Sequence, residues 1–329
     1  MSKTVIPPDY DERRGLDVLH TQQAIEDIKR NFVANLKNAL NLTRVSAPLF
    51  VDPKTGLNDD LNNVERPVSF DIRETGQTVQ VVHSLAKWKR YALHRYGFKP
   101  GSGLWTDMNA IRRDEELDNL HSIYVDQWDW EAILPDGCRN EAYLRDVVCR
   151  IAKAISKTAE PYKQLSSDVY FITSQQLEDL YPDQTPKQRE NLLLKEKKVA
   201  FIMQIGDVLA SGQKHDGRAP DYDDWTLNGD LMYYNEVLDC AFEVSSMGIR
   251  VDAESMRRQL EKSGCMERAS LPFHQHVLDG TLPLTIGGGI GQSRLCMLIL
   301  DKVHIGQVQA SVWDQQTLDT CQAAGVTLL

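Results

Sequence analysis

The sequence predicts a single mixed α+β domain. Three observations lead to this fold class: helical periodicity over residues 21–40, strand-like alternation over residues 123–130 and 238–251, and the lack of any repeat or linker that divides the chain. With 329 residues, the chain is long enough to bury a substantial core. We expect one domain over residues 19–329, preceded by a loose polar arm over residues 1–18.

Composition and cysteine usage exclude several classes of protein. Lys and Arg number 37 against 47 Asp and Glu, a formal net charge of −10, which disfavours a protein whose main task is to bind nucleic acid. The six cysteines are scattered and form no C-x-x-C pair, so neither a zinc site nor a disulfide framework is indicated. No apolar run is long enough to span a membrane, and we expect a cytoplasmic protein without membrane or nucleic-acid partners.

The first structured element is a helix followed by a short strand. Apolar residues from Ile25 to Leu40 recur every three or four positions, which places them on one helix face, and Thr21 can cap the helix. Residues 42–50 then resemble a strand interrupted by Pro48, which suits a sheet edge or a subunit boundary. A helix followed by a loop proline is the simpler interpretation of the same residues.

Two lysines stand at the start of the next helix. After a polar loop over residues 51–76, which contains Asp59, residues 79–82 are strand-like and lead into a helix start with Lys87 and Lys89. Such lysines form either a solvated basic face or an anion-binding site. The solvated face is the commoner arrangement, because lysine is rarely buried.

A strand, a charged turn and a second strand are predicted between residues 103 and 130. Arg112 lies in the turn. On the second strand, Gln127 and Asp129 continue an apolar face that begins at Ile123, because side chains alternate along a strand. These polar groups are either satisfied at the end of the sheet or open into a polar pocket, and we favour the pocket.

The middle of the chain alternates helices, strands and one long polar loop. We expect a helix over 141–160, buried strands over 168–173 and 199–205, a polar loop over 206–229 with a turn at 228–230, and a long strand over 238–251. In the last strand, Glu243 should share a face with Ser245, opposite Ser246. A glutamate within a strand needs a partner, which is either a Lys or Arg side chain or a metal ion.

A glycine-rich stretch close to the C-terminus precedes an apolar helical run. Gly287, Gly288, Gly289 and Gly291 let the backbone approach a ring or a phosphate, and Arg294 can stack on a base or bind phosphate oxygens. The same glycines could form a hinge before a core helix. No Gly-Lys-Ser/Thr follows, and Arg294 replaces the third glycine of the dinucleotide fingerprint, which excludes a P-loop and a Rossmann opening.

Taken in order, three of these features resemble the motifs of one enzyme class. Residues 44–49 resemble motif 1 of the class II aminoacyl-tRNA synthetases, residues 111–115 resemble motif 2, and Gly287-x-Gly289-x-Gly291-x-x-Arg294 resembles motif 3. A closer likeness extends from about residue 21 to the C-terminus. The stretches VVHSLAKWKR, LHSIYVDQWDWE, HDGRAPDYDDW, LNGD, AFEVSSMGIRVD, TIGGGIGQSRL and HIGQVQ look like the ammonia-dependent asparagine synthetases of type A, the aspartate–ammonia ligases.

This resemblance implies a fold, an assembly and a reaction. The implied fold is a mostly antiparallel sheet flanked by helices, similar to a class II synthetase, and the implied assembly is a homodimer. The side-chain carboxylate of aspartate would attack the α-phosphorus of ATP and form β-aspartyl-AMP and pyrophosphate, after which ammonia would release asparagine and AMP. ATP would be a substrate and Mg²⁺ a cofactor, since attack of one anion on another requires cations near the phosphates.

The resemblance also assigns roles to residues at the matching positions. The aspartate site would contain Asp59, Ser84, Lys89, Gln127, Asp129 and Arg250. The ATP site would contain Arg112, Ser122, Asp230, Ser246, Gly289, Gly291 and Arg294. Asp230 and Glu243 would hold the metal, and Arg218 and Asp223 would lie in a lid loop. The catalytic residues would be Arg112, Arg294, Asp59 and Asp223, of which the two acids would orient ammonia or take a proton from ammonium.

The same residues bear on two other functions. An enzyme that charges tRNA with aspartate or asparagine would need an anticodon-binding module, which is not recognisable in this acidic chain. A catalytically idle synthetase paralogue, serving as a binding module, would tend to lose the motif arginines and substrate acids that are present here. Glutamine as the nitrogen donor would need a glutaminase domain with an N-terminal cysteine, and residue 2 is Ser.

Overall fold

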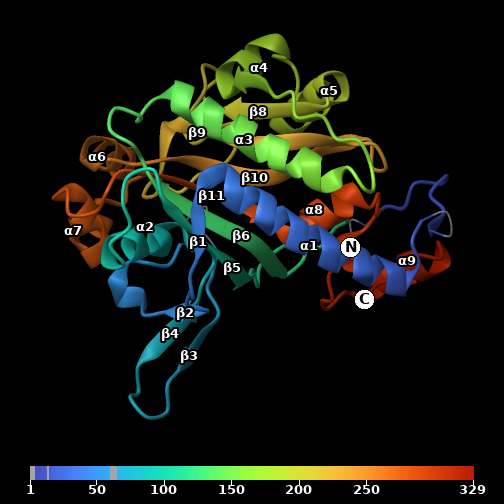
Figure 1. The fold of residues 1–329 in the computed structure, drawn as a ribbon, viewed down its shortest axis with the longest axis horizontal. Coiled ribbons are helices and arrows are strands. Elements are labelled where there is room, and N and C mark those ends of the chain that lie inside the picture. The colour runs from blue at the N-terminus through green and yellow to red at the C-terminus, as the bar shows by residue number, and fades with distance from the viewer. Residues whose placement is uncertain (1–3, 13–14, 60–64) are drawn as a thin grey trace.

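A computed structural model describes residues 4–12, 15–59 and 65–329 (Figure 1). The helices are α1 (Val18–Leu40), α2 (Ala86–Arg95), α3 (Glu141–Ala159), α4 (Ser174–Leu180), α5 (Pro186–Lys197), α6 (Ala253–Lys262), α7 (Pro272–Leu278), α8 (Gln292–Ile299) and α9 (Gln315–Ala323). The strands are β1 (Leu42–Arg44), β2 (Phe50–Val51), β3 (Ser69–Asp71), β4 (Thr78–Val81), β5 (Gly103–Ile111), β6 (Tyr124–Ile133), β7 (Tyr170–Thr173), β8 (Val199–Met203), β9 (Asp223–Asn235), β10 (Cys240–Arg250) and β11 (Thr285–Gly291). Short 3₁₀ helices are η2 (Pro53–Thr55), η3 (Met266–Ser270) and η4 (Ile305–Gln307).

Eight strands form one large sheet in the order β1-β5-β6-β11-β10-β9-β8-β7. Within the described part of the chain, the two outermost pairs, β1·β5 and β7·β8, are parallel and the inner pairs are antiparallel. A small sheet of β2, β4 and β3 extends away from the large one (Figure 1). The expected mostly antiparallel sheet flanked by helices is confirmed, and the interrupted strand at residues 42–44 lies at the sheet edge.

The main core lies on one face of the large sheet. Alternate side chains of the central strands, such as Trp128, Trp130 and Ile290, point to this face and are almost fully buried. Helices α1 and α3 run across it, and α8 packs beside α1 (Figure 1). The predicted helical periodicity after residue 21 is what lays Ile28 and Phe32 against the sheet.

Helices in the described part of the chain cover the opposite face at its two ends. Helix α2 packs over Leu104 and Ile133 at the β5–β6 end, and α4 and α5 pack over Ile202 and Met232 at the β7–β9 end. The middle of this face, formed by β6, β11 and β10, is left for the functional site. Among the described residues, no helix combines the length and apolar character that crossing a membrane requires.

The N-terminal arm is packed rather than loose where the structure describes it. Asn119 accepts a hydrogen bond from the backbone N–H of Val5 (2.8 Å) and donates one to its carbonyl (2.9 Å). Residues 1–3 and 13–14 of the predicted arm lie outside the described residues. Helix α1 begins at Val18, and its cap is Asp17 rather than Thr21, because the Asp17 carboxylate accepts from the His20 N–H (2.8 Å).

The predicted turn at residues 228–230 is wrong. Residues 223–235 form the continuous strand β9, in which Asn228 bonds the backbone N–H and C=O of Ile205 (2.9 and 2.8 Å). Gly229 is needed for close packing, because a Cβ there would collide with the Ile202 carbonyl and the Phe201 ring. The polar loop therefore ends near residue 222. The strand β7, expected to be buried, lies at the sheet edge with Tyr170 41% exposed.

Candidate active site

A cavity of about 370 Å³ opens on the uncovered middle of the sheet. Its floor comes from β6, β10 and β11, and loops from both ends of the sheet form its walls. The pocket predicted from the Gln127 and Asp129 face is confirmed. The residues predicted from sequence that line the cavity are Ser84, Lys89, Arg112, Ser122, Gln127, Asp129, Arg218, Asp223, Glu243, Ser246, Arg250, Gly289, Gly291 and Arg294.

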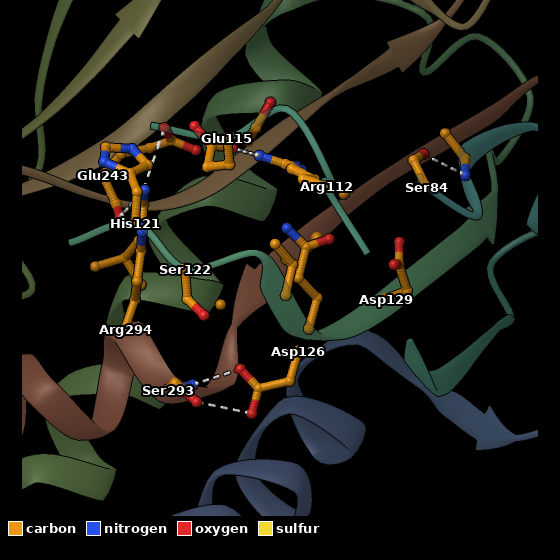
Figure 2. A pocket seen from close by; sticks show the side chains of 18 of the residues that line it. Ser84, Arg112, Glu115, His121, Ser122, Asp126, Asp129, Glu243, Ser293 and Arg294 are labelled. Atoms are coloured by element: carbon orange, nitrogen blue, oxygen red, sulfur yellow. Dashed lines mark hydrogen bonds and ion pairs between the residues drawn. The ribbon is translucent and has the colours of Figure 1, made fainter. Parts of the chain in front are cut away.

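The cavity has two chemically different ends. In Figure 2, Ser84 and Asp129 lie on one side of the view, and His121 and Arg294 lie on the other. The first end is built around a buried cluster of charged residues, which we call the charged cluster: Lys89, Asp129, Glu131, Asp223 and Arg250. The second end carries three partly buried arginines, and we call it the arginine end: Arg112, Arg218 and Arg294.

The charged cluster is a continuous network. Arg250 donates to both oxygens of Glu131 (Nε–Oε1 3.0 Å and Nη2–Oε2 2.7 Å) and also to Asp223. Lys89 donates to Asp129 and to the Gly288 carbonyl (2.9 Å). Two cations face three carboxylates, so the formal charge of the cluster is −1. A site of this kind suits a ligand that carries an ammonium group along with its carboxylates.

Burial and partners act in opposite directions on the pKa values of the cluster. Burial lowers the pKa of Lys89, although Asp129 and Glu131 oppose the effect. Burial alone would lower the pKa of Arg250, but Glu131 and Asp223 outweigh it and raise that pKa. Burial alone would raise the pKa of Glu131, and Arg250 brings it below the ordinary value instead. Mutual pairing therefore favours the ionised forms of Glu131 and Arg250.

The lysines at the start of α2 do not form a solvated face. Lys87 and Lys89 are 4% and 0% exposed. Lys87 Nζ donates to Asp221 (3.0 Å), a carboxylate that also accepts from His274 Nε2 (2.9 Å). The expected solvated face was wrong because each lysine pairs with a buried carboxylate, Lys87 with Asp221 and Lys89 with Asp129.

Glu131 is the functional residue that the sequence interpretation missed. It is fully buried, and besides Arg250 it accepts from Thr285 Oγ1 (2.7 Å). The signal was present, because period two along β6 carries the face of Gln127 and Asp129 on to residue 131. Extending the alternation by one step would have placed a third polar side chain in the same row.

The glycines of β11 serve close approach and not backbone freedom, since none of them has a positive φ. A Cβ on Gly287 would overlap the Glu131 carboxylate, and a Cβ on Gly289 would overlap the Gln127 amide. The stretch is a strand rather than a hinge. Two of the glycines thus make room for side chains of β6, and Gly289 and Gly291 also line the cavity.

We expect Gly287→Ala to destabilise the protein by about 1–3 kcal/mol or more, because Glu131 is pinned and cannot yield to the new methyl group. Urea denaturation measures the loss. Gly15→Ala is the control, since its added Cβ would lie 3.5 Å from the nearest atom, an ordinary van der Waals contact. Equal stability of Gly287→Ala and the wild type would contradict this packing account.

At the arginine end, each arginine faces a carboxylate. Arg218 donates to Asp230 and to Ser246 (both 2.6 Å). Arg294 Nη1 lies 3.6 Å from Glu243, and Arg112 Nη1 lies 3.7 Å from Glu115. These pairs hold the arginines at the cavity wall. A more highly charged anion can replace the carboxylates as the partner of each arginine.

A β-bulge corrects the predicted faces of β10. The pairing of β10 with β9 shifts register between Glu243 and Ser245, so the alternation slips by one residue. Glu243 and Ser246 consequently both line the cavity, whereas the sequence predicted opposite faces. Simple period-two counting cannot detect such an insertion.

Three predicted site residues lie in places that differ from the expectation. Asp59 is 1% exposed and does not line the cavity. Burial raises the pKa of the neighbouring Tyr222, and the charge of Asp59 adds to this effect. Asp230 lies behind Arg218, outside the lining. Asp223 belongs to β9 and is fixed by Arg250, so it is a wall residue rather than part of a lid. Arg218 does come from the long loop.

Asp230 and Glu243 have the donor chemistry of a magnesium site. Burial and, to a smaller extent, the charge of Glu243 raise the pKa of Asp230 to about 7, although Arg218 opposes the shift. A divalent cation would relieve this repulsion between carboxylates, and carboxylate oxygens are preferred Mg²⁺ ligands. Among the described residues, no group of three or more His, Cys, Asp or Glu side chains could hold a metal by itself, so the remaining ligands would have to come from elsewhere.

Comparison with known proteins agrees with this geometry. The family model described as aspartate–ammonia ligase matches residues 19–325. Aspartate–ammonia ligases of Ruminiclostridium cellulolyticum, Clostridium tetani and Lactobacillus johnsonii are 56%, 54% and 54% identical to the chain. The matches cover 100%, 99% and 99% of this chain and 100%, 98% and 99% of the relatives.

Solved structures show the same fold at low identity. The asparaginyl-tRNA synthetase of Pyrococcus horikoshii in complex with asparaginyl-adenylate has a TM-score of 0.60 at 14% identity, covering 89% of this chain and 70% of that one. The aspartyl-tRNA synthetase of Entamoeba histolytica has a TM-score of 0.60 at 15% identity, covering 90% and 59%. The synthetase-like fold is confirmed, and with near-complete matches to the curated relatives the chain belongs to the aspartate–ammonia ligases, enzymes that form a carbon–nitrogen bond.

Proposed function

We propose that this chain synthesises L-asparagine from L-aspartate, ammonia and ATP through β-aspartyl-AMP, releasing AMP and pyrophosphate, as a homodimer in the cytoplasm. One observation carries the proposal: a single cavity joins a charged cluster suited to an amino acid with an arginine end suited to a nucleotide. A carboxylate is a poor electrophile, and adenylation gives it a good leaving group. Both reactants must therefore meet in one cavity.

The charged cluster would bind aspartate. Asp129 Oδ2 is buried and has no hydrogen-bond partner among the described residues, so it can accept from the α-ammonium group of the substrate. Lys89 and Arg250 supply positive charge for the carboxylates, and Ser84 and Gln127 supply neutral hydrogen bonds. Because Glu131 holds Arg250 from behind, the guanidinium keeps its orientation while the cavity is empty.

The arginine end would bind ATP and stabilise the charge that develops at the α-phosphorus. Arg112 would contact the α-phosphate, Arg218 would close from the long loop, and Arg294 would engage the nucleotide. Ser122, Ser246, Gly289 and Gly291 would form the remaining wall. Asp230 and Glu243 would hold Mg²⁺, which supplies positive charge on the phosphates when it is bound.

In the second step, ammonia must lose a proton as it attacks the acyl carbon. Asp223 lines the cavity beside the charged cluster and can orient ammonium or accept its proton. Asp59 does not line the cavity, so we assign this step to Asp223. The formal charge of −1 on the cluster favours ammonium over other incoming groups.

A product assay tests the proposed function. Purified protein with ATP, Mg²⁺, aspartate and ammonium should yield asparagine together with AMP and pyrophosphate in equal amounts. ADP as the product would overturn the adenylate intermediate, and formation of aspartyl-tRNA without asparagine would favour a tRNA-charging enzyme. Glutamine in place of ammonium should give little product, and lack of exchange between ATP and pyrophosphate in the presence of aspartate would indicate an idle paralogue.

The small sheet is where we place the contact of the homodimer. Leu49, Phe50 and Phe70 are 52%, 43% and 42% exposed, and the rings of Phe50 and Phe70 meet edge to face at 5.2 Å. We expect Phe50→Asp combined with Phe70→Asp to convert the dimer to a monomer, measured by light scattering on a sizing column. Val208→Asp, at a position 58% exposed elsewhere, is the control. A monomeric wild type would contradict the proposal.

A further inference from the structure

The stretch HIGQVQ near the C-terminus ends in a glutamine that the proposed reaction does not use. Gln309 is 6% exposed and lines the cavity next to Ile305 and close to the start of α8. Its side-chain carbonyl Oε1 is buried and has no hydrogen-bond partner among the described residues. A buried acceptor of this kind costs free energy unless a ligand supplies a donor.

Hydrogen bonding fixes which way the Gln309 amide points. Its Nε2 donates to Asp126 Oδ1 and to Ser293 Oγ, both at 3.1 Å. Asp126 pairs with Lys29 (3.1 Å) and can only accept. Ser293 gives its single hydroxyl proton to Asp126 Oδ2 (2.8 Å), so it too must accept from Gln309 (Figure 2 shows the Asp126–Ser293 contact). Reversing the amide would set its carbonyl against two acceptors, and Oε1 therefore stays on the other side.

The surroundings of Gln309 match a purine base. Leu120 and Ile305 are apolar members of the cavity lining, and Ser293, to which Gln309 is bonded, directly precedes Arg294 with its flat guanidinium. The phosphate-binding arginines Arg112 and Arg218 come from other segments. Besides its ribose hydroxyls, ATP offers one group of hydrogen-bond donors, the 6-amino group of adenine.

We propose that Oε1 of Gln309 accepts a hydrogen bond from the 6-amino group of adenine, and that Asp126 and Ser293 make this preference rigid. A 6-oxopurine would present an oxygen to a carbonyl that cannot rotate away, so the site selects 6-aminopurine nucleotides. Gln309 is thus a specificity-determining residue and Asp126 a positioning residue. This inference rests on the proposed use of ATP and adds its base selectivity.

The test compares ATP, purine riboside triphosphate, which lacks only the amino group, and inosine triphosphate. In the wild type, kcat/KM for the nucleotide should fall about tenfold without the amino group and further with the 6-oxo group. Gln309→Met keeps the shape of the side chain and removes the acceptor. In this variant, kcat/KM for ATP should fall about tenfold, and kcat/KM for the two other nucleotides should nearly equal it. Asp126→Asn should shrink the discrimination against inosine triphosphate, because the amide can then turn.

Ratios between nucleotides cancel any general loss of activity in a variant. Gln315→Met, on the exposed face of α9, should keep the wild-type ratios. Equal use of ATP and purine riboside triphosphate by the wild type would overturn the proposal without any variant. So would a Gln309→Met enzyme that keeps the wild-type ratios, or one that instead loses its sensitivity to 2′-deoxy-ATP. If the wild type makes no asparagine, the proposed function fails, and calorimetric binding of the same nucleotides still decides the role of Gln309.

Discussion

Glu131→Gln should abolish most asparagine synthesis and destabilise the fold by about 3–5 kcal/mol, since it removes the charge of one partner from a buried ion pair. Arg250 would keep Asp223 but lose its hydrogen bonds to the Glu131 carboxylate, and its guanidinium would no longer be held toward the cavity. We expect the KM for aspartate to rise and kcat to fall at least 100-fold, measured alongside denaturation by urea.

The matched control is Glu141→Gln, the same chemical change at a 45% exposed side chain that pairs with Arg145. It should alter stability by less than about 0.5 kcal/mol. Because pairing lowers the pKa of Glu131 in the folded protein, its contribution should be complete above the ordinary pKa of 4.5 and shrink as the pH falls through the folded value. Wild-type kinetics in Glu131→Gln would contradict the positioning role of this carboxylate.

Arg112→Ala should reduce kcat about 100- to 1000-fold, because it removes a donor aimed at charge that develops during adenylation. The exchange of pyrophosphate into ATP should fall in parallel, while the KM for aspartate should change little. Its neighbour Arg113 is exposed and does not line the cavity, so Arg113→Ala controls for loss of charge in the same turn. An Arg112→Ala enzyme with unimpaired exchange would place the α-phosphate elsewhere.

Local periodicity predicted the parts of this fold that local rules determine. The helix over α1 and the faces of β6 follow from spacing alone, and Arg112 and Arg294, predicted from the motifs, line the same cavity. The resemblance supplied the sheet type and the enzyme family, which spacing could not. The likeness also predicted Lys89 as a site residue when frequency alone favoured a solvated lysine, and the structure places Lys89 buried in the cavity lining.

The structural features that differ from the predictions depend on contacts between residues distant in sequence. Asn119 bonds the N-terminal arm at Val5, 114 residues away in sequence. The turn-like pair Asn228–Gly229 lies in a strand because Asn228 bonds Ile205, just after β8, and Gly229 packs against the Ile202 carbonyl of β8. The bulge near Glu243 inserts one residue that no alternation reveals. The need for Gly287 became visible only with the Glu131 carboxylate in place.

The paired arginine end implies that nucleotide binding is an ion exchange. Without a nucleotide, Arg218 is neutralised by Asp230 and Arg294 by Glu243. A polyphosphate that takes over the arginines releases those two carboxylates, which then need a counter-cation of their own. A nucleotide that arrived with Mg²⁺ would supply both an anion for the arginines and a cation for the carboxylates, whereas the free polyanion would supply only the anion. If the enzyme uses ATP with Mg²⁺ as proposed, these charges would favour the magnesium complex of the nucleotide over the free polyanion.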